Sequence, residues 1–158
     1  MRLFHGSYLS VEKPDISFSR SNVDFGKGFY TTPIWEQAVS WANRFKRKHG
    51  RSVVSSYEID MDALRSQNTI LTFKEHSEEW LDFVVACRCG ENTGNYDIVI
   101  GGVANDRVFD TIQLYFDGLI DKSESIKRLC YDRPNLQYCF RKQTVIDDYL
   151  KFISSEVL

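Results

Sequence analysis

The sequence lacks the features of membrane, secreted and strongly charged proteins. No stretch approaches the roughly 20 apolar residues that a helix needs to cross a bilayer. The N-terminal sequence MRLFHGSYLS also has no long apolar run of the kind found in secretion signals. Twenty Lys and Arg against 22 Asp and Glu give a net charge of -2, which indicates no general attraction to nucleic acid or to an anionic membrane. We therefore expect a soluble, cytoplasmic protein without membrane contact.

Familiar metal and nucleotide motifs are also missing. The four cysteines and three histidines show none of the spacings of zinc sites, so we expect reduced cysteines and no bound metal. The segment GKGFY lacks the G-x-G-x-x-G spacing of a dinucleotide-binding turn, and no G-x-x-x-x-G-K-[ST] loop occurs. A nucleotide, if bound, must be bound in another way.

Internal repeats, low-complexity tracts and linkers are absent, and the three prolines are scattered between patterned segments. Hydrophobic residues make up 42% of the chain, enough for a substantial core, which argues against disorder. A length of 158 residues is close to the usual size of one compact domain. We expect a single domain over residues 1–158.

The hydrophobic pattern predicts a mixed order of strands and helices. Short apolar or alternating runs predict strands over residues 2–7, 53–59, 68–73, 96–103 and 135–142. Helical spacing predicts helices over residues 33–49, 77–89, 107–116 and 123–131, and from residue 144 to the end of the chain, with a short turn or helix over 62–66. This order is not the regular alternation of a doubly wound sheet and favours the α+β class.

The helix over residues 33–49 carries the clearest signals. Thr32 is a candidate cap, Pro33 suits the first turn, and Gly50 can end the helix in the left-handed conformation. Its last turn is basic over residues 46–49, which complements the negative end of the helix dipole. We prefer this interpretation of the basic run to a nucleic-acid patch.

Three segments contain more polar residues and glycines than packing requires: His5-Gly6-Ser7, DFGKGFYTT over residues 24–32 and NLQYCF over 135–140. Together, in this order and spacing, they resemble the ADP-ribosyltransferase superfamily, in the diphtheria-toxin-like and poly-ADP-ribose-polymerase-like branch whose signature is His, Tyr and then Glu or a substitute. The closest resemblance is to DUF3990, a bacterial family of unknown-function domains with L-[YF]-H-G-S, D-F-G-x-G-F-Y and N-x-Q-[YF]-x-F blocks. It covers almost the whole chain.

The resemblance implies a role for each matching residue. His5 would bond the ribose of NAD, and Gly6 would offer backbone groups to the nicotinamide amide. Tyr30 would stack on the nicotinamide, and Trp41, placed where this branch often has a second aromatic residue, would stack on its other side. Packing in the core is at least an equal interpretation of Trp41, because this residue also fits the apolar face of its helix.

Ser7 and Gly28 lie in the same segments and are further candidates for NAD binding. Arg20 lies in the stretch between the first strand and the first helix, where a cation can meet the NAD pyrophosphate. A guanidinium suits phosphate oxygens, so Arg20 is our first choice for that contact.

The third signature position holds Gln137 instead of Glu. Strand alternation puts Gln137 on the face opposite Tyr138, where it is free to face a cleft. A glutamate there would bond a ribose hydroxyl and stabilise the positive charge that develops at the anomeric carbon. Glutamine keeps the hydrogen bond but loses the charge. Asp106 is the nearest candidate for the missing carboxylate, although its other interpretation is an ordinary helix cap.

The sequence as a whole predicts one α+β domain similar to the ADP-ribosyltransferase fold, with a split β-sheet, flanking helices and NAD in the cleft as co-substrate. His5, Tyr30 and Gln137 are the candidate catalytic residues. The resemblance implies transfer of ADP-ribose to a macromolecule, protein or nucleic acid, with release of nicotinamide. It also implies a bacterial toxin-like effector that a small antitoxin protein controls. The alternatives are a non-catalytic module that binds NAD or ADP-ribose, and an interaction domain.

Overall fold

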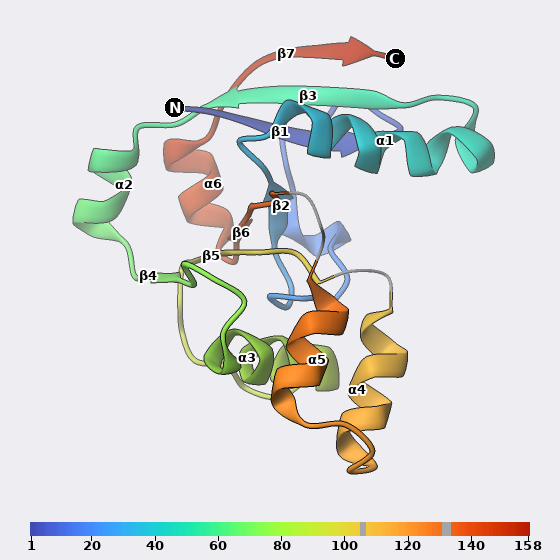
Figure 1. The fold of residues 1–158 in the computed structure, drawn as a ribbon. Coiled ribbons are helices and arrows are strands. Elements are labelled where there is room, and N and C mark those ends of the chain that lie inside the picture. The colour runs from blue at the N-terminus through green and yellow to red at the C-terminus, as the bar shows by residue number, and fades with distance from the viewer. Residues whose placement is uncertain (105–106, 131–133) are drawn as a thin grey trace.

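The computed structural model describes residues 1–104, 107–130 and 134–158. Over these residues the chain is mixed α+β, with two small β-sheets and six α-helices. One sheet lies at one end of the molecule, and the second sheet lies in the middle. Three helices gather at the other end, namely α3 (Glu78–Cys89), α4 (Val108–Phe116) and α5 (Lys122–Leu129) (Figure 1). The predicted α+β class is confirmed.

The first sheet consists of β1 (Arg2–Ser7), β3 (Val53–Glu58) and β7 (Lys151–Val157), in the order β1-β3-β7 with antiparallel pairing throughout. Helix α1 (Trp35–His49) packs on β1 and β3. The predicted helix from residue 144 to the chain end is wrong in its second half. Helix α6 (Gln143–Tyr149) ends at an extended Leu150, and the residues that follow form β7. Their content of β-branched residues and serines disfavours a helix, and β3 supplies a partner for a strand.

The second sheet has the order β2-β6-β5-β4, formed by β2 (Phe29–Thr31), β6 (Gln137–Phe140), β5 (Ile98–Gly101) and β4 (Ile70–Thr72). Strands β4 and β5 run parallel, and the other pairs are antiparallel. Strand β2 was not predicted, because three residues are too few to show an alternating pattern. The two sheets adjoin where Phe4 of β1 and Thr32 exchange backbone hydrogen bonds of 2.8 and 2.9 Å.

The remaining elements lie beside this second sheet or connect the two. They are a short 3-10 turn (Ile16–Phe18), α2 (Met61–Gln67), α3 (Glu78–Cys89), α4 (Val108–Phe116) and α5 (Lys122–Leu129). Helix α3 begins as predicted, with the Ser77 hydroxyl accepting from the Trp80 backbone N–H at 3.2 Å, and it ends at Gly90 with φ 77°.

Helix α1 also ends where the sequence predicts, at Gly50 with φ 70°, but it begins later. Its N-cap is Ile34, which makes no side-chain cap bond, so Pro33 lies outside the helix. The Thr32 hydroxyl accepts from the Ile34 backbone N–H at 3.1 Å and forms a local turn before the helix instead of a cap. The prediction of Thr32 as cap is therefore wrong, because Thr32 is held by its backbone bridge to β1.

Helix α1 approaches β1 so closely that only small residues fit between them. A Cβ atom built on Gly6 would lie 2.2 Å from the backbone oxygen of Ala38 and 2.8 Å from the backbone nitrogen of Ala42. Ala38 and Ala42 are the buried residues of the helix, and the larger Trp41 is 46% exposed. The alternative interpretation of Trp41 as a core residue is therefore wrong, because the face that meets β1 carries the alanines.

We expect Gly6→Ala to lower the free energy of unfolding by about 3 kcal/mol, because the added methyl meets backbone atoms that cannot rotate away. Urea unfolding followed by circular dichroism measures the change, with an unaltered m-value as the sign that only stability has changed. Ser7→Ala, at the half-buried neighbouring position of β1, is the matched control and should change stability little. Equal stability of Gly6→Ala and the control would show that helix and strand can separate without cost.

Candidate functional site

The fold brings the three candidate segments side by side. Strand β1 meets the end of β2 through the bridge between Phe4 and Thr32, and β2 pairs with β6 along its whole length. His5, Tyr30 and Gln137 each lie on one of these three strands, although Tyr30 and Gln137 are more than one hundred positions apart in the chain. The junction of β1, β2 and β6 is therefore the candidate site.

A hydrogen bond to a backbone oxygen of β2 holds the His5 ring in one orientation. Its Nδ1 lies 2.7 Å from the backbone oxygen of Tyr30, and since that oxygen can only accept, Nδ1 carries the proton. The imidazole packs on the Phe29 ring with 4.5 Å between centroids. Burial lowers the pKa of His5 below its ordinary value, against a smaller opposing effect of the bond to Tyr30. At neutral pH the ring is uncharged, and its Nε2 is an acceptor.

Tyr30 turns its hydroxyl back onto the loop that precedes β2. The hydroxyl donates to the backbone oxygen of Gly26 at 2.6 Å and accepts from the backbone N–H of Phe25 at 3.0 Å. Burial raises the pKa of Tyr30 well above its ordinary value, so the phenol stays protonated. Its side chain thus closes the loop at residues 24–28, and Gly26 there has φ 74°, a conformation that favours glycine.

Gln137 is buried, and both N–H groups of its side-chain amide donate hydrogen bonds. Its Nε2 donates to Oδ2 of Asp24 at 3.1 Å and to the backbone oxygen of Gly102 at 3.3 Å. Strand alternation predicted an amide free to face a cleft, but residues on both faces of β6 are buried. The face that carries Gln137 also carries Cys139, which packs in the cluster formed with Trp80 of α3. Burial raises the pKa of Cys139 to about 12, so this thiol is not a nucleophile at neutral pH.

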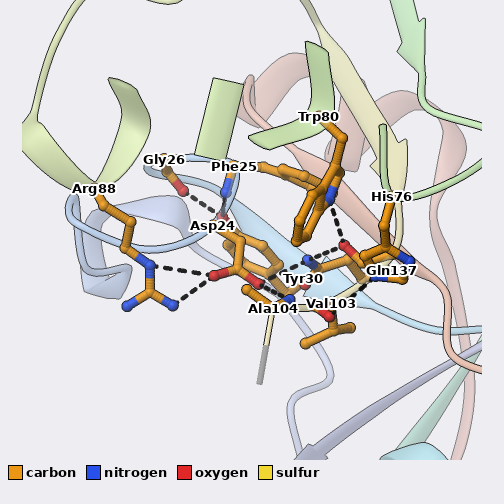
Figure 2. A network of polar contacts seen from close by, with 11 residues as sticks. Asp24, Phe25, Gly26, Tyr30, His76, Trp80, Arg88, Val103, Ala104 and Gln137 are labelled. Carbon is orange, nitrogen blue, oxygen red and sulfur yellow. Dashed lines mark hydrogen bonds and ion pairs between the residues drawn. The ribbon is translucent and has the colours of Figure 1, made fainter. Parts of the chain in front are cut away.

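The residue at the centre of the site, Asp24, was not singled out by the sequence. Its Oδ1 forms an ion pair with Arg88, at 2.5 Å from Nη2 and 3.2 Å from Nε, and its Oδ2 accepts from the backbone N–H of Ala104 at 2.9 Å and from Gln137 (Figure 2). Asp24 is only 5% exposed. Its place next to Phe25 and Gly26 was visible in the sequence, but its partners are far away in the chain, and no local pattern indicates them.

A second group of residues fixes the turn that follows β5. The indole nitrogen of Trp80 donates to the backbone oxygen of Gly102 at 3.0 Å, and the His76 ring lies edge-on to Trp80 with 4.5 Å between centroids. A Cβ on Gly102 would overlap the His76 ring, so a larger residue here would displace that ring. The Asn135 side chain accepts from the backbone N–H of Val103 at 2.6 Å. These contacts tie β5, α3 and the start of β6 together.

The other predicted residues are placed around this junction or outside it. Gly28 is buried, and a Cβ there would lie 2.6 Å from both the sulfur of Cys139 and the backbone oxygen of Phe140, so this glycine allows β2 to approach β6. Ser7 is half-buried at the end of β1, and Arg20 is exposed.

Trp41 lies on the outside of α1, with the Arg44 guanidinium 4.5 Å from its ring centroid. Asp106, the candidate for a missing carboxylate, lies outside the described residues.

Two cavities lie away from these residues. One, of about 530 Å³, is lined by Glu12–Asp15 and by residues of α6, and the other, of about 620 Å³, by residues 58–63, Met1 and the end of α6. His5, Tyr30 and Gln137 line neither of them. Within the described parts of the chain, no group of three or more His, Cys, Asp or Glu residues is placed to hold a metal ion, and no helix is long and apolar enough to span a membrane.

The profile of a family described as a protein of unknown function, DUF3990, matches residues 1–152. The chain belongs to the DUF3990 family. No curated protein and no solved structure matches it. Its membership in DUF3990 confirms the resemblance seen in the sequence at the level of the family, and the wider link to ADP-ribosyltransferases remains a prediction.

We expect His5 to titrate below its ordinary pKa of 6.5 in the folded protein. Because the folded pKa is lower than the unfolded one, the unfolded chain binds the proton more readily as the pH falls. His5 therefore has no destabilising effect above pH 6.5, and the free energy of unfolding decreases as the pH falls from 6.5 through the folded pKa.

An NMR titration of the histidine rings measures this pKa, with His5→Gln identifying the His5 signal and the ring ¹⁵N shifts reporting the proton on Nδ1. A pKa at or above 6.5, or a proton on Nε2 at neutral pH, would contradict the burial and the bond to Tyr30.

Proposed function

We propose that this DUF3990 chain is an NAD-dependent ADP-ribosyltransferase with a fold of that superfamily, and that it modifies a macromolecule with release of nicotinamide. The supporting observation is the junction of β1, β2 and β6, where His5, Tyr30 and Gln137 lie on three adjoining strands. The resemblance implies the same three positions as the His, Tyr and third signature residues. Two separate sheets that a bridge between Phe4 of β1 and Thr32, directly after β2, joins are also what a split sheet requires.

In this reaction the bond between the nicotinamide nitrogen and the anomeric carbon of the ribose breaks. The nicotinamide nitrogen keeps the electron pair and leaves uncharged, and positive charge develops on the ribose. An acceptor group then bonds to the anomeric carbon and loses its proton. The protein contributes position and electrostatic stabilisation, with no protein nucleophile.

The chain's own groups fit parts of NAD to different degrees. His5 fits a ribose hydroxyl, because its Nδ1 is committed to Tyr30 and its Nε2 can accept a hydrogen bond. The exposed ring of Trp41 offers a π-face to a flat base. The exposed Arg20 suits the pyrophosphate. By contrast, the hydroxyl of Tyr30 and the nitrogen of Gln137 already have partners, so Tyr30 can offer only its ring and Gln137 only its oxygen.

The second candidate function is binding of NAD or ADP-ribose without turnover. Two observations favour it: the third signature residue is a neutral amide, and that amide is buried with its nitrogen held by Asp24 and Gly102. For the first candidate, the acceptor is a protein or a nucleic acid, and a small antitoxin protein would control the activity in the cell.

Purified protein incubated with NAD separates the two functions by nicotinamide release and by calorimetric binding. We expect release in wild type and a loss of about 10²-fold or more in turnover for Gln137→Ala, the scale seen when a positioned group at the transition state is removed. NAD affinity should fall much less. The matched control is Gln113→Ala, on the exposed surface of α4. Binding without release in every tested acceptor mixture would favour the binding module, and the absence of both would overturn the proposal.

The place of Trp41 can be tested by fluorescence. If nicotinamide stacks on the exposed indole, NAD should quench its emission, and Trp41→Phe should keep most of the affinity, because stacking needs a π-face and not the indole N–H. Trp41→Ala should lose affinity. Equal quenching in wild type and Trp41→Phe would assign the signal to the other tryptophans and remove Trp41 from the site.

A further inference from the structure

The amide of Gln137 can lie in only one of its two orientations. Its nitrogen faces Oδ2 of Asp24 and the backbone oxygen of Gly102, at 3.1 and 3.3 Å. Both neighbours are acceptors, so an oxygen in the same place would face two oxygens. With both N–H groups used, the oxygen Oε1 is the atom left for another partner. Among the residues that the structure describes, none donates a hydrogen bond to Oε1.

Asp24 is itself fixed by groups from two other parts of the fold. Arg88, at the end of α3, holds Oδ1, and the backbone N–H of Ala104, after β5, holds Oδ2 at 2.9 Å. An ionised carboxylate suits this place, because all of its partners are donors and it has no donor of its own. The acceptor that sets the orientation of Gln137 is therefore rigid and nearly excluded from water.

We propose that Asp24 is a positioning residue, which holds the amide of Gln137 so that Oε1 is presented to a ribose hydroxyl of NAD. This inference rests on the proposed function. It assigns to the aspartate of the D-F-G segment a task that the glutamate of the superfamily signature performs without help. A glutamate offers an oxygen in either orientation of its side chain, whereas a glutamine offers one only if its nitrogen is turned away.

Asp24 does not replace the missing negative charge of that glutamate. Its carboxylate is paired with the Arg88 guanidinium at 2.5 Å, so the two together carry no net charge toward the ribose. The contribution of Asp24 is orientation, which acts on the rate through the geometry of Gln137. Asp24 therefore has a positioning role and not a catalytic one. Its replacement should change the amide signals of Gln137 together with kcat.

The first measurement uses the wild-type protein alone. In ¹⁵N NMR spectra the side-chain amide of Gln137, identified by its absence in Gln137→Met, should give two distinct proton signals that exchange slowly with water. Rapid exchange of both protons in folded wild type would overturn the proposal, whatever the variants do.

The second measurement compares Asp24→Asn with Asp97→Asn, a change at a buried aspartate outside the site that pairs with Lys142 and accepts from the backbone N–H of Thr69 at 2.6 Å. Asparagine has one acceptor oxygen and one donor nitrogen, so it cannot accept from Arg88, Ala104 and Gln137 together. We expect Asp24→Asn to lose the slow exchange of the Gln137 amide and to lower kcat for nicotinamide release about 10-fold or more, with KM for NAD changed less than about twofold. Asp97→Asn removes a comparable buried carboxylate and should lower thermal stability while the Gln137 signals and kcat stay close to wild type.

Each outcome supports or overturns the positioning role of Asp24. If folded Asp24→Asn keeps the slow exchange, or keeps the wild-type kcat, Asp24 does not position Gln137. If Asp97→Asn lowers kcat as much as Asp24→Asn with the Gln137 signals unmoved, Asp24 acts through stability alone, and the proposal is overturned. If wild type releases no nicotinamide and binds no NAD, the proposed function fails, and the ribose contact fails with it. The amide signals then still show whether Asp24 fixes Gln137.

Discussion

The buried carboxylate of Asp24 is the contact on which the arrangement of the site depends. It joins the loop before β2 to the end of α3 through Arg88, to the turn after β5 through Ala104 and to β6 through Gln137. Removing one partner would leave a buried charge with donors or acceptors unmatched, which is costly in a region of low polarity. The four segments are therefore held to one geometry by a single group, and Tyr30 closes the same loop from its other side.

The two sheets meet through a backbone bridge and through a shared cluster of buried side chains, in which Phe29 packs edge-on to Tyr57. Phe4 and Thr32 bridge them, the His5 imidazole bonds the backbone oxygen of Tyr30, and glycines at positions 6 and 28 let α1 and β6 approach β1 and β2. Contacts of this kind leave little freedom for either sheet to turn against the other.

Local signals in the sequence predicted those features, such as helix ends, that depend on residues nearby in the chain. Helix α3 begins at Ser77 and ends at Gly90 as expected, because caps are set by neighbours in the chain. Strands β2 and β7 were not predicted. Strand β2 is only three residues long, and β7 depends on β3, a partner from a distant part of the sequence. The burial of Gln137 and the exposure of Trp41 also follow from distant partners, namely Asp24 and the close approach of β1 to α1. The order of the three segments that meet at the site was visible, but their hydrogen-bond partners were not.

The return of the chain from α6 into β7 has a consequence for where this domain can be divided. The DUF3990 profile matches residues 1–152, yet β7 runs from Lys151 to Val157 and covers one edge of β3. A chain cut at the limit of the family match would leave the central strand of the first sheet with a row of unpaired backbone groups beside five buried residues. Such an open edge is a template for pairing with other chains, so self-association would replace an intramolecular strand. The folded unit therefore extends beyond residue 152, where the family match ends.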